Sequence, residues 1–100
     1  MAVHESETLD ALLRALAHPA RRQILAVAAA APVSAGTLAS RLGLANATTS
    51  EHLKVLRKTG LVTMTVQGTW RLYRTDHARV AEAEALLADF TGSLPQEEER

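Results

Sequence analysis

The residues of this chain that could do chemistry lie mostly between positions 46 and 58, where short polar side chains precede a group of basic ones. Near the start of a helix, amides, hydroxyls and carboxylates can reach the edges of nucleobases. Basic side chains farther along can contact phosphates, and free backbone N–H groups at the helix start favour a nearby phosphate. The candidate contacts to base edges are Asn46, Thr48, Ser50 and Glu51; those to phosphates or flanking edges are His52, Lys54, Arg57 and Lys58.

Glu51 does not fit a surface that attracts phosphate, because a carboxylate facing DNA repels the backbone unless it accepts a hydrogen bond from cytosine N4. Two interpretations follow: Glu51 determines sequence specificity, or it pairs within the protein with Lys54 or Arg57. A capped amphipathic surface helix is the simpler alternative for the whole segment.

The charge of the chain is divided into three blocks, although the formal net charge of the 100 residues is zero. Residues 1–13 carry three acidic residues and no Lys or Arg, a charge of minus three. Residues 14–74 carry nine basic residues and one acidic residue, a charge of plus eight. Residues 75–100 carry two basic and seven acidic residues, a charge of minus five. A basic middle between acidic ends is typical of a central nucleic-acid surface.

Several kinds of chemistry are excluded by composition and spacing. With no cysteine in the sequence, disulfides, thiolate metal sites and thiol redox sensing are absent. The four histidines form no ligand cluster, and no glycine-rich phosphate loop, Gly-x-Ser-x-Gly or His-Glu-x-x-His motif occurs. We therefore expect no enzyme, no metal and no cofactor. An acidic start and the lack of an 18-residue apolar run predict a cytoplasmic protein.

Periodicity and capping residues predict four helices in the first 59 residues. Leucines three and four positions apart indicate a helix that starts near Ser6 or Thr8, either of which could cap it, and that ends at the break before Pro19. The next helix runs from Pro19 to about residue 30. Ser34 caps a helix over 35–42 that Gly43 ends, and Asn46 or Ala45 precedes a helix over 47–59. Asparagine is the better cap by its chemistry.

An alternating pattern from Leu61 predicts a hairpin, the wing, over 61–74 with its turn at 67–69. Arg71 and Arg74 are candidate DNA contacts from this wing, whereas its tip lacks a basic residue. The single tryptophan, Trp70, and Tyr73 are expected to pack the second strand onto the helices. A last helix follows from Thr75 or Asp76 to Gly92.

This order of elements, α-α-α-α-β-β-α, predicts a mainly α fold with a β-hairpin, the winged helix-turn-helix. The length of the chain suits one domain over 1–95, followed by a disordered acidic tail over 96–100.

Three stretches, 16–25, 38–44 and 50–62, resemble the ArsR-type family of bacterial winged-helix repressors, and the similarity spans about residues 9–80. The Ser-x-His-Leu-x-x-Leu-x-x-x-Gly-Leu-Val run is its most specific part. The resemblance implies operator DNA as a partner and release by an effector. Ser34 and Gly36 stand where metal-sensing relatives carry cysteines, and Asp76-His77 matches only half of a second family metal site. An effector-free repressor and one that senses a small organic ligand in the dimer cleft both remain open.

The same resemblance implies a homodimer paired through the first and last helices, whose apolar stripes supply the candidate interface: Leu9, Leu12, Leu13, Leu16, Val80, Ala83, Leu87 and Phe90. Two recognition helices would then read the half-sites of a palindromic operator. Glu51 and the uncharged wing tip support an alternative from another class, a winged-helix protein-interaction module without specific DNA binding.

Overall fold

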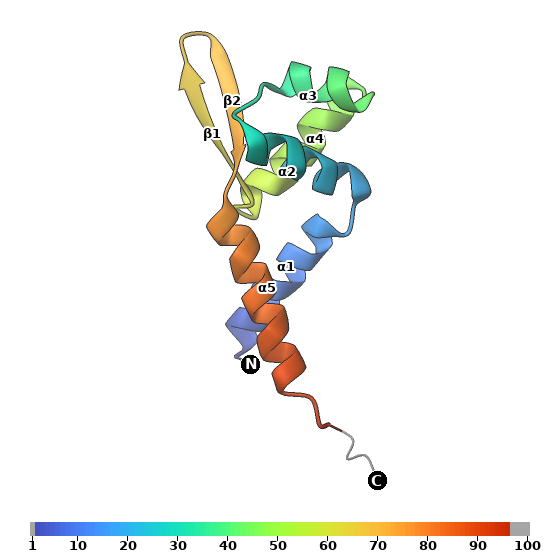
Figure 1. The fold of residues 1–100 in the computed structure, drawn as a ribbon, viewed down its shortest axis with the longest axis vertical. Coiled ribbons are helices and arrows are strands. Elements are labelled where there is room, and N and C mark those ends of the chain that lie inside the picture. Colours follow the sequence, from blue (N-terminus) through green and yellow to red (C-terminus); the bar gives the residue numbers. More distant parts are fainter. Residues whose placement is uncertain (1, 97–100) are drawn as a thin grey trace.

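The computed structural model describes residues 2–96 and has five helices and one two-stranded antiparallel hairpin in the order α-α-α-α-β-β-α (Figure 1). This order confirms the predicted winged-helix architecture. Apart from Gln96, the expected acidic tail over 96–100 lies outside the described residues.

Helix α1 (Val3–Leu16) begins earlier than the capping residues predict. Its N-cap is Ala2, which makes no side-chain capping bond, so the prediction of Ser6 or Thr8 as the cap is wrong. Instead, the Thr8 hydroxyl lies inside the helix and donates to the His4 carbonyl at 3.0 Å. A threonine that bonds back to the preceding turn is compatible with a helix interior.

Helix α2 (Pro19–Ala30) begins at the predicted proline, which occupies the first helical position, where a missing N–H breaks no intrahelical bond. Helix α3 (Ala35–Leu42) also has its predicted bounds. Its cap, Ser34, accepts a hydrogen bond from the Thr37 N–H at 3.2 Å. Gly43 ends the helix with φ +66°, a left-handed conformation in which a residue with a Cβ is strained.

Helix α4 (Asn46–Lys58) starts one residue before the favoured boundary. Its N-cap is Ala45, whose side chain makes no capping bond, so asparagine, favoured as the cap for its chemistry, is instead the first helical residue. The Asn46 amide is exposed and is left for other partners.

The hairpin consists of β1 (Val62–Gln67) and β2 (Trp70–Thr75), paired from Val62↔Thr75 to Gln67↔Trp70. The connection between α2 and α3 pairs with β2 along the edge that β1 does not occupy, because Val33 and Tyr73 exchange two backbone hydrogen bonds of 3.0 and 2.8 Å. Tyr73 is half-buried, as expected, but the Trp70 side chain is 64% exposed, so the expectation that it packs onto the helices is wrong.

Helix α5 (His77–Gly92) is capped by Asp76, whose carboxylate accepts from the Arg79 N–H at 3.2 Å. In Figure 1, α5 and α1 lie side by side at the end of the molecule opposite the hairpin tip. The two helices expected to form the dimer therefore lie together, remote from α3 and from the tip of the wing.

The core is one cluster of buried aliphatic side chains from the five helices, from the start of β1 and from the turn before it. Its fully buried members include Leu12, Ile24, Leu38, Leu53, Leu56 and Leu61. Burying a leucine side chain stabilises a fold by about 2 kcal/mol, so this cluster fixes the helix that carries the candidate site. Within residues 2–96, no helix has both the length and the apolar character needed to cross a membrane.

Candidate nucleic-acid interface

One face of α4 is buried and holds the helix in place. Thr49, Leu53 and Leu56, at positions i, i+4 and i+7, are 0–2% exposed. The Thr49 hydroxyl donates to the Ala45 carbonyl at 3.0 Å, so this buried polar group is satisfied. The remaining faces of α4 are free to present the predicted polar side chains.

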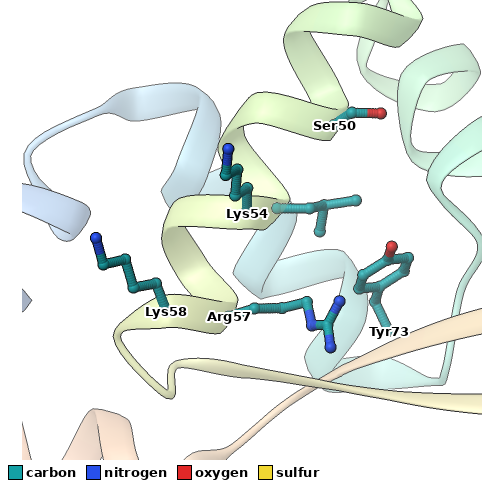
Figure 2. A pocket seen from close by; sticks show the side chains of 6 residues that line it. Ser50, Lys54, Arg57, Lys58 and Tyr73 are labelled. Atoms are coloured by element: carbon teal, nitrogen blue, oxygen red, sulfur yellow. The ribbon is translucent and has the colours of Figure 1, made fainter.

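The side of α4 that faces the hairpin forms a groove of about 410 Å³ with Tyr73 of β2, and Leu53 forms part of its lining. Ser50, Lys54, Arg57 and Lys58 line the same groove. Figure 2 shows the Ser50 hydroxyl and the Arg57 guanidinium on the side of Tyr73, whereas Lys58 points away from it. By helical spacing, Asn46 lies above Ser50 on this side. The structure therefore brings four of the ten residues predicted to contact DNA into one groove.

Glu51, Lys54 and Lys58 are exposed where α4 faces away from the core. Glu51 makes no salt bridge with any residue that the structure describes, so it is not paired with Lys54 or Arg57. The salt bridge found in residues 2–96 joins Arg79 and Glu82 at 2.7 Å. The basic side chains of α4 consequently keep their full charge for an outside partner.

His52 lies on a different flank of α4, with Thr48 one turn before it. The His52 ring is half-buried, and its Nδ1 accepts a hydrogen bond from Arg21 Nε of α2 at 3.2 Å. The rings of His52 and His18 are 5.6 Å apart. Burial lowers the pKa of His52, and the positive charge of Arg21 and the neighbouring His18 lower it further. The lowered pKa favours the neutral imidazole, and the ring contacts α2, outside the groove.

The two wing arginines project from opposite faces of the hairpin, because successive strand residues alternate. Arg71 pairs with Val66 and shares a face with Tyr73, the tyrosine that lines the groove. Arg74 pairs with Thr63 and shares the other face. Arg71 therefore continues the basic surface of α4, and Arg74 does not.

The residues expected at a dimer interface divide into three groups by exposure. Leu9, Leu12 and Ala83 are buried within the protomer. Leu16 and Val80 are half-buried and pack against the core. Leu13, Leu87 and Phe90 are 40%, 43% and 46% exposed, and together with Val3 they are the large apolar side chains that α1 and α5 leave exposed.

Two residues of this region were not anticipated as site residues. Tyr73 was assigned to packing, although the alternation of the strand places it on the same face as Arg71, which is a usable signal. Arg21 bonds to a residue 31 positions away, and no local pattern indicates that contact. No group of three potential metal ligands occurs in the described part of the chain.

Comparisons with known proteins agree with this geometry. A family model described as a helix-turn-helix domain matches residues 16–65. The HTH-type transcriptional regulator CmtR of Mycobacterium tuberculosis is 39% identical over 88 residues, which are 88% of this chain and 69% of that protein. The biofilm growth-associated repressor of Agrobacterium fabrum is 36% identical over 80 residues, 79% of this chain and 68% of that protein.

Solved structures show the same fold. An ArsR-like transcriptional regulator from Rhodococcus superposes with a TM-score of 0.85 and 28% identity, over 92% of this chain and 84% of that chain. NolR from Sinorhizobium fredii superposes with a TM-score of 0.73 and 27% identity, over 91% of each chain. The chain therefore belongs to the ArsR-type family of winged helix-turn-helix transcriptional regulators.

Proposed function

We propose that the protein is a homodimeric cytoplasmic repressor that binds a palindromic operator through α4 and the hairpin wing, without catalysing a reaction. The observation that carries this proposal is the groove between α4 and β2, whose polar and basic side chains have no ionic partner in the described residues. A surface of unpaired basic groups beside short polar ones suits a partner that offers phosphates and base edges.

The first turns of α4 supply the side chains with the reach for base edges: Asn46, Thr48, Ser50 and Glu51. Asn46 and Ser50 lie on the groove side of the helix, and the unpaired Glu51 is available to accept from cytosine N4. Lys54, Arg57 and Lys58 follow at the phosphate-contacting end, and Arg71 adds a cation from the wing. In this arrangement His52 acts indirectly, since its ring is held by Arg21.

The proposed dimer face is the exposed apolar surface of α1 and α5, with Leu13, Leu87 and Phe90 at its centre. Helices α1 and α5 lie at the end of the molecule opposite the tip of the wing (Figure 1). A two-fold axis there would leave both copies of α4 free to contact one DNA duplex. The two half-sites would be about 34 Å apart, one turn of the double helix.

A second candidate function, a protein-interaction module without specific DNA binding, is favoured by the exposed apolar side chains of the wing. Val66 and Trp70 are 62% and 64% exposed near its tip. The two side chains lie on opposite faces of the hairpin, since Val66 pairs with Arg71 and Trp70 is the next residue along β2, so the wing tip exposes an apolar group on each face, and such groups can contact a protein partner. This candidate predicts weak retention on heparin or nonspecific DNA at low salt.

The testing experiment is fluorescence-anisotropy binding to the DNA upstream of the protein's own gene and to a scrambled duplex of the same composition, across a salt series. Specific, salt-sensitive binding to the upstream duplex supports the repressor. Equal weak binding to both duplexes calls for a selection from random sequences, and a selection without an enriched site would leave the interaction module. Light scattering during gel filtration tests the dimer, with Leu87→Glu as a variant expected to be monomeric.

A further inference from the structure

A second groove, of about 590 Å³, lies between α1 and the C-terminal half of α4, on a different side of that helix from the candidate DNA surface. Residues from α2 and α5 complete it. Its volume is in the range of sites that hold small organic molecules. Lys58 lines both this groove and the candidate DNA surface, and the proposed function uses no other residue of this groove for DNA contact.

The charge of the groove is strongly positive. Arg14, Arg21, Lys58 and Arg79 line it against one carboxylate, Glu7, which leaves an excess of three positive charges. His4 also lines its edge. Cationic walls around a partly enclosed space concentrate anions, because the potential is less screened there than on an open surface.

Two of these arginines are held in place by neutral acceptors. Arg21 donates through Nε to His52 Nδ1 at 3.2 Å and through Nη1 to the Arg14 carbonyl at 3.3 Å. Arg79 donates through Nε to the Thr59 carbonyl at 2.8 Å. A guanidinium has five N–H donors, so each arginine is oriented and still has donors to offer. Arg79 is also paired with a carboxylate on α5, whereas Arg21 makes no salt bridge with a described residue.

Ala11 and Ala15 of α1 and Val55 of α4 line the apolar part of the same groove. We infer that this groove binds a small organic anion, whose charged group contacts Arg14 and Arg21 and whose apolar body lies against these three side chains. A planar carboxylate fits the guanidinium best, because the fork of N–H donors can bind both oxygens at once.

The groove also adjoins the helix that carries the DNA surface. Arg21 contacts His52 in the middle of α4, and Val55 and Lys58 belong to both the groove and that helix. An anion that attracts the Arg21 guanidinium competes with its bond to His52 and changes how α4 is held against α2. This coupling rests on the proposed DNA-binding function, whereas anion binding itself does not.

The proposed dimer face lies elsewhere on α1. Leu13 is two residues from both Ala11 and Ala15, and two residues correspond to about 200° of rotation around a helix. Leu13 therefore faces away from the groove, and a partner seated on Leu13, Leu87 and Phe90 would leave the groove open.

The test is a titration of the full chain, labelled with ¹⁵N and free of DNA, with benzoate, phenyl phosphate and the neutral analogue benzyl alcohol. We expect benzoate and phenyl phosphate to shift the amide signals of Ala11, Ala15 and Val55 in a saturable manner, and benzyl alcohol to bind more weakly. Arg14→Gln should weaken benzoate binding about tenfold, the effect of one charge-assisted hydrogen bond. Arg22→Gln is the matched control, since the Arg22 guanidinium donates to the Leu16 carbonyl outside the groove and its loss should change nothing.

Three results would overturn the site: no saturable shift with either anion, equal affinity for benzyl alcohol, or equal losses in the two arginine variants. Anisotropy with operator DNA then tests the coupling. Benzoate should change the affinity for DNA, and DNA should change the affinity for benzoate by the same factor. Unchanged DNA affinity with intact anion binding would refute the coupling alone, and absent DNA binding would refute the proposed function while the site stands.

Discussion

Lys54→Gln is the substitution that measures most directly how α4 meets DNA. Lys54 lines the groove beside Ser50 and Arg57, is exposed, and has no ionic partner among the described residues, so its charge is fully available to a phosphate. Glutamine keeps most of the length of the side chain and the helix propensity, and it removes only the charge. The expected loss is therefore electrostatic, and the fold should melt at an unchanged temperature.

The size of the effect follows from counterion release. Each lost phosphate contact lowers the slope of log affinity against log salt by about 0.9, and a dimer that loses one contact from each copy loses about 1.8. Between about 50 mM and about 200 mM salt, the ratio of wild-type to variant affinity then falls about 3.5-fold for one contact and about 12-fold for two. The slope thus reports how many copies of Lys54 touch the duplex.

The assay is anisotropy across this salt series with the upstream duplex and with scrambled DNA, and both duplexes should show the same change in slope. Arg22→Gln removes the same charge from α2 and serves as the control. An unchanged slope, or a change equal to that of the control, would show that Lys54 does not contact phosphate and that the surface assigned to α4 is wrong.

Three further predictions concern the stability of the fold. Thr75→Val removes the buried 2.7 Å hydrogen bond from Thr75 Oγ1 to the Leu25 carbonyl; we expect a cost of about 1–2 kcal/mol, measured as a lower Tm by circular dichroism. Asp76→Ala removes the cap of α5 and should cost about 1 kcal/mol in urea unfolding, whereas Asp76→Asn should retain most of that stability. The pKa of His52 is lowered from 6.5 in the folded state, so as the pH falls the unfolded chain takes up a proton at this histidine before the folded chain does. The free energy of unfolding should therefore decrease as the pH falls below 6.5. His52→Gln removes the titrating group and should make that decrease smaller in urea unfolding measured across this pH range.

Where several local signals coincide, the sequence predicted the fold closely. Helix α3 has a serine cap at Ser34 and a glycine stop at Gly43, and its bounds were predicted to the residue. The start of α1 was missed because Ser6 and Thr8 resemble caps by type. A cap is defined by backbone conformation, and in the structure the extended residue is Ala2.

In the candidate site as well, features set by neighbouring residues could be predicted, and contacts between distant segments could not. Helical spacing was enough to gather Ser50, Lys54 and Arg57 on the exposed surface of α4. It could not show that His52 is held by Arg21, since that contact depends on how α2 packs against α4. The exposure of Trp70 could not be predicted for a related reason: it depends on how closely α2 and α3 approach β2, and the side chain is left 64% exposed beside Val27 of α2 and Thr37 of α3.

The backbone pairing between Val33 and Tyr73 determines where the chain can accept inserted residues. An insertion between α2 and α3 would break two hydrogen bonds that align the connection with β2. By contrast, Gly68 and Thr69 connect the strands in the open, with nothing packed around Gly68. A peptide epitope or a fluorophore is therefore best introduced at this turn, where a reporter could follow the wing without altering the helices.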